Sequence, residues 1–117
     1  MILIKFSATW CGPCKVMHDV LEDVFAEHPE YRKEIDFTEI DVDDDINDLS
    51  GQYGVTNIPA LVAVSNEGKR LDSIVGTHTK EDVIQFIEHY KNLCKKKKEA
   101  AMVSFFRFIS LYTLSAF

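Results

Sequence analysis

The sequence has little basic charge, few cysteines and no glycine- or serine-rich linker, and each shortage excludes a class of protein. Its 13 lysines and arginines are outnumbered by 19 acidic residues, which gives a formal net charge of -6, whereas nucleic-acid-binding domains carry a basic patch. We therefore expect no nucleic acid partner. Three cysteines in 117 residues are too few for a scaffold held together by disulfides. With no internal repeat or linker, a chain of this length predicts one domain.

The first residues lack the features of an export signal. Residues 1–6 are mostly apolar, but they include no basic leading region, no long hydrophobic run and no small-residue cleavage site. The expected location is therefore the cytoplasm, a reducing compartment. Cysteines in that compartment more often perform redox chemistry than form structural bridges.

Hydrophobic periodicity predicts an α/β domain with the order β-α-β-α-β-β-α. The first two strands are separated by a helix, which favours a parallel crossover, and the last two form a hairpin. The expected architecture is a four-stranded mixed sheet with helices on both faces. Strands are predicted over residues 2–6, 35–42, 59–64 and 69–75. Helices are predicted over 46–53, over 79–95 and over a first segment whose apolar stripe begins at Val16 and which ends at residue 28.

Three consecutive aspartates, Asp43, Asp44 and Asp45, precede the predicted short helix. Acidic side chains at that place interact favourably with the positive end of the helix dipole. A solvated helix start is the favoured interpretation, and a divalent-metal site is the alternative.

The motif Cys11-Gly12-Pro13-Cys14 lies between the first strand and the first helix. A sulfur at a helix N-terminus faces unsatisfied backbone N–H groups, which stabilise the reactive thiolate. We therefore predict that Cys11 is the exposed, attacking thiolate and that Cys14, one turn inside, is the shielded resolving thiol. Pro13 in the first turn costs no helical hydrogen bond.

A zinc half-site is the alternative interpretation of these two cysteines, with His18 as the nearest further ligand. Structural zinc sites need four ligands, and the sequence contains no second Cys-x-x-Cys or paired histidines. We therefore expect no metal and no bound cofactor beyond the Cys11–Cys14 pair. Cys94 lies on the apolar face of the last helix and is predicted to be buried and unreactive.

Four segments in order resemble the thioredoxin family: ATWCGPCK at 8–15, YGV at 53–55, NIPAL at 57–61 and VG at 75–76. The resemblance covers about residues 1–93 and predicts a thioredoxin-like domain over 1–94. It implies a protein thiol-disulfide oxidoreductase that reduces protein disulfides and is itself restored by an external disulfide reductase.

The resemblance also implies a substrate-docking surface around the cysteines. It implies that Pro59 is cis and faces them, although Pro59 by itself would be expected to be trans. It further implies that the backbone of Ile58 is offered to an extended substrate. The residues implied for docking are Trp10, Gly12, Pro13, Ile58, Pro59 and Gly76.

Two other functions stay open from the sequence. One is a binding module that uses the fold as a partner surface, such as an accessory subunit, with an incidental redox centre. The other is a membrane-tethered reductase that serves one dedicated partner.

The sequence departs from the family pattern at its start and on its first strand. The family usually has a further strand and helix before the first apolar run, so we expect a trimmed fold in which the strand over 35–42 is an exposed edge. The family also carries a buried aspartate beneath the resolving cysteine and a lysine on the neighbouring strand. Here these positions hold Lys5 and Glu39.

Strand parity predicts that Lys5 and Glu39 meet beneath Cys14 as an ion pair. Compared with the family pattern, the lysine and the acidic residue have exchanged strands. Both residues have odd numbers on adjacent strands that are expected to be parallel. The alternative is that the lysine stem reaches water.

The segment 95–117 begins with four lysines and continues into an apolar, aromatic run over 100–117. Eighteen residues would span about 27 Å as a helix, the short limit for crossing a bilayer. The three interpretations are membrane contact, packing on the sheet edge or on another subunit, and a disordered or non-native extension.

Overall fold

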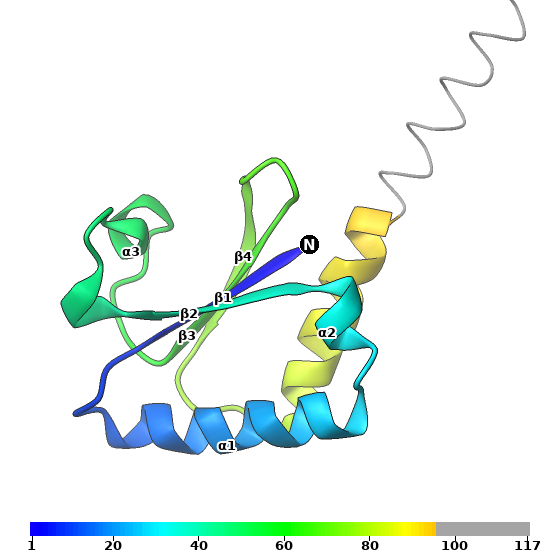
Figure 1. The fold of residues 1–117 in the computed structure, drawn as a ribbon, viewed down its shortest axis with the longest axis horizontal. Coiled ribbons are helices and arrows are strands. Elements are labelled where there is room, and N and C mark those ends of the chain that lie inside the picture. Colours follow the sequence, from blue (N-terminus) through cyan, green and yellow to red (C-terminus); the bar gives the residue numbers. More distant parts are fainter. Residues whose placement is uncertain (96–117) are drawn as a thin grey trace, which may run out of the picture.

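A four-stranded mixed sheet organises the part of the chain that the computed structural model describes, residues 1–95 (Figure 1). The strand order is β2-β1-β3-β4. β1 is parallel to β2, while β3 is antiparallel to both β1 and β4. The predicted order of elements and the mixed sheet are confirmed. The strands are β1 (Ile2–Ser7), β2 (Asp36–Asp41), β3 (Ala60–Val64) and β4 (Arg70–Val75).

The central strands β1 and β3 are buried on both faces, as the near-continuous apolar sequence of a central strand requires. Alternate residues of β1 belong to different cores. Leu3 lies in the core under the first helix, whereas Ile4 and Phe6 lie in the core on the opposite face. Lys5 shares the parity of Leu3, so it faces the first helix.

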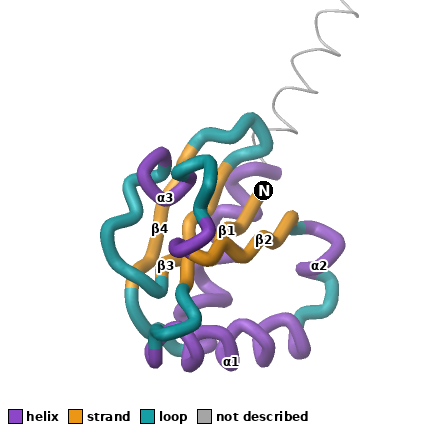
Figure 2. Tube along the Cα trace, turned by 60° about the vertical axis from the view of Figure 1, so that its left-hand side comes forward, coloured by secondary structure: helices purple, strands orange, loops and turns teal. Residues whose placement is uncertain are grey.

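One face of the sheet is covered by α1 (Gly12–Glu27) and by the helix over residues 80–95, which both views place on the same side (Figures 1 and 2). The apolar stripe of α1 buries Met17, Leu21 and Val24 against the sheet. The helix ends where the sequence predicts, because Pro29 disfavours helical geometry at His28.

The opposite face is covered by a shorter pair of elements, the 3-10 turn η1 (Val42–Asp44) and α3 (Leu49–Gln52). The predicted helix over 46–53 is therefore too long. The side chain of Asp45 accepts hydrogen bonds from the backbone N–H groups of Leu49 and Ser50, at 2.9 and 2.8 Å. These bonds fix the helix start at Leu49, so the acidic residues act partly as caps.

A further short helix, α2 (Tyr31–Glu34), follows Pro29 and was not expected from the sequence. Four residues are too few for a periodic pattern. Its anchor is Tyr31, which is completely buried and donates a hydrogen bond to Oε1 of Glu88 at 2.5 Å. The Tyr31 ring also stacks on His28 and lies under the ammonium of Lys91.

The final described helix begins as the sequence predicts, with the Thr79 hydroxyl accepting a hydrogen bond from the N–H of Asp82 at 3.2 Å. Cys94 packs against the core on the apolar face of this helix, but it is less buried than predicted. Its thiol is free and only partly buried, because it lies near the helix end and borders a cavity of about 340 Å³ beside Met1 and Lys91.

The C-terminal tail predicted over 95–117 lies outside the described residues from residue 96 onward. Within residues 1–95, no helix is long and apolar enough to cross a membrane.

Candidate functional site

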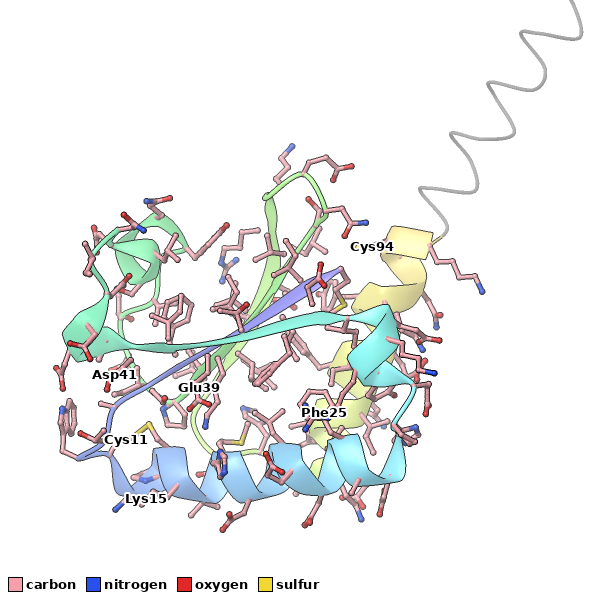
Figure 3. The ribbon with its side chains drawn as sticks, viewed as in Figure 1. Cys11, Lys15, Phe25, Glu39, Asp41 and Cys94 are labelled. Carbon is pink, nitrogen blue, oxygen red and sulfur yellow. A yellow bond between two sulfur atoms is a disulfide. The ribbon has the colours of Figure 1, made fainter. Side chains whose placement is uncertain are left out.

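Cys11 is the N-cap residue of α1, and its sulfur is bonded to that of Cys14 (Figure 3). The two Cα atoms lie 5.2 Å apart, within the usual range for a disulfide. The Cys11 sulfur also accepts a hydrogen bond from the backbone N–H of Cys14 at 3.2 Å. A thiolate at Cys11 would therefore face an N–H group that α1 leaves without a backbone partner.

The two cysteines differ little in burial. The exposed fraction is 5% for Cys11 and 3% for Cys14, so the prediction that Cys11 is exposed is wrong for the disulfide form. Ala8, Val42 and Ile58 pack around the pair and cover it. The helix-cap position therefore distinguishes the two sulfurs, and solvent exposure does not.

Trp10 stands beside the disulfide with 68% of its surface exposed. Its indole Nε1 donates a hydrogen bond to Oδ2 of Asp43 at 2.8 Å, which fixes the ring against η1. Gly12 and Pro13, at the start of α1, are exposed as well. An open groove of about 240 Å³ runs from the ring and is lined by Trp10, Val42, Ser50, Val55, Thr56 and Ile58.

The loop before β3 and the loop after β4 meet beside this groove. The peptide bond between Ile58 and Pro59 is cis, as the resemblance implies. The carbonyl of Pro59 accepts a hydrogen bond from the N–H of Gly76 at 2.8 Å. Gly76 has a φ of 87°, a left-handed conformation that favours glycine. Ile58 packs against the cysteines, so the residues expected for docking lie around one site.

Lys5 and Glu39 are direct partners in the register of β1 and β2. The Lys5 ammonium lies 3.2 Å from Oε1 of Glu39. The same oxygen accepts a hydrogen bond from the Ser7 hydroxyl at 3.1 Å. The pair is asymmetric, because the side chain of Lys5 is 2% exposed and that of Glu39 is 46% exposed. The alternative in which Lys5 reaches bulk water does not fit this burial.

An open cavity of about 140 Å³ lies between this ion pair and Cys14. Glu39 points from β2 toward α1 (Figure 3). The lining residues include Lys5, Ser7, Cys14, Lys15, His18 and Glu39.

Two residues of the site were missed by sequence reasoning. Ser7 shares the strand parity of Lys5, and this signal could have identified it as a further partner of Glu39. Asp43 carried no such signal, because its contact with Trp10 depends on how the chain turns after β2.

The zinc alternative finds no support in the described part of the chain, where no three His, Cys, Asp or Glu side chains are grouped to hold a metal. His18 is exposed and borders the open pocket beside Cys14 and Glu39. Of the three aspartates, Asp43 accepts a hydrogen bond from Trp10, and Asp45 accepts bonds from the first backbone N–H groups of α3.

Comparison with known proteins agrees with this geometry. The family model described as thioredoxin matches residues 1–89. A thioredoxin of Staphylococcus aureus is 35% identical over 88 residues, 75% of this chain and 80% of that protein. The chloroplastic M-type thioredoxin of Chlamydomonas reinhardtii is 30% identical over 91 residues, and the match covers 78% of this chain and 61% of that protein.

Solved structures give the same result. The crystal structure of a thioredoxin from Nicotiana alata superposes with a TM-score of 0.62 at 32% identity, covering 76% of this chain and 71% of that one. A four-stranded mixed sheet with a cysteine pair at the start of its first helix defines the class of thiol-disulfide oxidoreductases built on this fold. The chain belongs to the thioredoxin family.

Proposed function

We propose that the protein reduces disulfides of protein substrates by dithiol-disulfide exchange. The observation that carries the proposal is the position of Cys11, at the cap of α1, bonded to Cys14 and beside the exposed ring of Trp10. A reversible pair and a docking surface at one site are what such an exchange requires.

In the first step, the Cys11 thiolate attacks one sulfur of the substrate disulfide. A mixed disulfide forms, and the other substrate sulfur leaves as a thiolate that takes up a proton. In the second step, Cys14 loses its proton and attacks the Cys11 sulfur, which closes the Cys11–Cys14 disulfide and releases the second substrate thiolate. Two electrons pass to the substrate in total.

Return to the dithiol requires two electrons from outside the chain. We propose that an external disulfide reductase supplies them and that the protein acts in the cytoplasm, where such a supply keeps thiols reduced. No bound cofactor takes part in the exchange. In this scheme Lys5 and Glu39 set the electrostatic environment of Cys14, with which they share a cavity.

An insulin-reduction assay tests the proposal. With dithiothreitol as the electron source, the protein should accelerate the precipitation of insulin chains. The variant Cys11→Ser should show only the uncatalysed rate, while Cys94→Ser should retain the wild-type rate because Cys94 lies far from the disulfide in Figure 3. If the wild-type protein failed to accelerate reduction, a binding module with an incidental redox centre would be the better description.

A further inference from the structure

The groove beside the disulfide is lined mainly by apolar side chains. Val42, Val55 and Ile58 line it together with Trp10. Val42 and Ile58 also pack against the cysteines, so a segment lying in the groove lies next to the Cys11–Cys14 pair. The exposed indole of Trp10 offers an apolar surface at the entrance.

One side of this groove carries a concentration of negative charge. Residues 41–48 contain five aspartates, Asp41, Asp43, Asp44, Asp45 and Asp48, and the sequence has no basic residue between Lys33 and Lys69. Among residues 1–95, none of the ion pairs involves these aspartates. Their charge is therefore not neutralised by a cation of the described chain.

Two of the aspartates form hydrogen bonds with residues that line the groove. Asp43 holds the ring of Trp10 through its carboxylate. Asp45 accepts a hydrogen bond from the backbone N–H of Ser50, which lines the groove, and this bond holds the pKa of Asp45 below its ordinary value. Asp44 is exposed on η1 next to Asp43. Asp41 lies at the same end of the sheet as Cys11 (Figure 3).

We infer that the groove selects extended protein segments in which a lysine or arginine lies within a few residues of the disulfide to be reduced. This inference rests on the proposed function and specifies its substrate class. The apolar part of the segment packs on Trp10 and Ile58, while its basic side chain lies against the carboxylates of Asp43 and Asp44. Complementary charge of this kind increases the association rate and discriminates against acidic partners.

The full chain can be tested on three disulfide-bonded peptide pairs. They differ only in the residues that flank the disulfide, which are lysine in the first, glutamine in the second and glutamate in the third. At low ionic strength, the wild-type protein should reduce the lysine peptide about tenfold faster than the glutamate peptide, measured as kcat/KM, with the glutamine peptide between them. At about 1 M salt, where the Debye length is about 3 Å, the three rates should converge.

The variant Asp43→Asn/Asp44→Asn removes two charges and keeps an amide oxygen that can accept the hydrogen bond from Trp10. It should lower the lysine-to-glutamate ratio at least threefold. The control Asp19→Asn/Glu22→Gln removes two exposed charges from the outer face of α1 and should leave the ratio unchanged. Equal rates on all three peptides, or an equal effect of the control, would overturn the inference. Failure to reduce any peptide would instead contradict the proposed function.

Discussion

The ammonium of Lys5 lies 3.2 Å from Oε1 of Glu39, yet the lysine is 2% exposed and the glutamate 46% exposed. The two partners therefore contribute differently to stability. A lysine charge away from water depends on its partner, whereas a half-exposed carboxylate can be solvated on its own. The pair is neither a fully buried ion pair nor a surface one.

Removal of Glu39 should cost more stability than removal of Lys5. Glu39→Ala leaves a buried ammonium without its carboxylate, and we expect a loss of about 2 kcal/mol in the free energy of unfolding. This is less than the roughly 3–5 kcal/mol typical of a fully buried pair, because water can enter at the open side. Lys5→Met replaces the buried charge with an apolar chain and should cost less than about 1 kcal/mol. Urea unfolding measures both values.

The double variant Lys5→Met/Glu39→Ala completes a double-mutant cycle, which measures the interaction between the two side chains. In the Lys5→Met background, Glu39→Ala should cost less than about 1 kcal/mol, because no charge is left stranded. Additive losses in the double variant would show that the two side chains do not interact and that the ion pair contributes nothing to stability.

Lys5 should also affect the redox potential, because it lines the same cavity as Cys14. A cation near a sulfur favours its thiolate, which exists only in the reduced protein, so Lys5 stabilises the reduced form. We expect Lys5→Met to make the potential more reducing by about 10–30 mV. The exchange Lys5→Asp/Glu39→Lys should shift it in the same direction.

Equilibration with glutathione at pH 7 measures this shift, and Lys33→Met, which removes an exposed lysine on α2, is the control. A potential equal to that of the wild type in both Lys5 variants would mean that the charge does not reach the sulfurs.

Substrate trapping tests the roles of the two cysteines. Because only the Cys11 sulfur occupies the cap of α1, Cys14→Ser should still attack substrates and accumulate mixed disulfides that dithiothreitol releases. Cys11→Ser should trap none. Adducts formed by Cys11→Ser and not by Cys14→Ser would reverse the assignment.

The sequence predicted the features that depend on local pattern. The strands, the stripe of α1 and the start of the last helix near residue 79 follow from hydrophobic periodicity. The pairing of Lys5 with Glu39 was predicted from their positions in the family pattern and their odd numbers. It holds because the partners in β1 and β2 are separated by 34 residues, an even offset that keeps odd-numbered residues of both strands on one face.

Features that depend on tertiary packing could not be predicted in this way. The burial of Cys11 results from Ala8, Val42 and Ile58, which come from three separate segments. The short helix α2 exists because Tyr31 reaches Glu88, 57 residues away. The difference in exposure between Lys5 and Glu39 reflects the position of β2 at the sheet edge, and strand parity carries no information on exposure.

The contact between Tyr31 and Glu88 predicts a dependence of stability on pH. The hydrogen bond from the Tyr31 hydroxyl is the main reason that the pKa of Glu88 lies below its ordinary value of 4.5. A carboxylate with a lowered pKa in the folded state contributes stability that is present above the unfolded pKa and is lost as the pH falls through the folded pKa. This contribution should therefore be complete at pH 7 and should be lost progressively as the pH falls below the ordinary value of 4.5 and through the lowered pKa of Glu88.

Tyr31→Phe removes the hydrogen bond and should raise the pKa of Glu88 toward its ordinary value. At pH 7 we expect a loss of about 1 kcal/mol, less than for a buried charged acceptor because the Glu88 side chain is 39% exposed. The difference from the wild type should shrink as the pH falls from 5 to 3.

Tyr53→Phe is the control, because the Tyr53 hydroxyl donates to the carbonyl of Gly68, which does not titrate. Its effect should be the same at every pH. If the loss in Tyr31→Phe were equally independent of pH, it would come from the packing of the hydroxyl group, and the bond to Glu88 would not be its source.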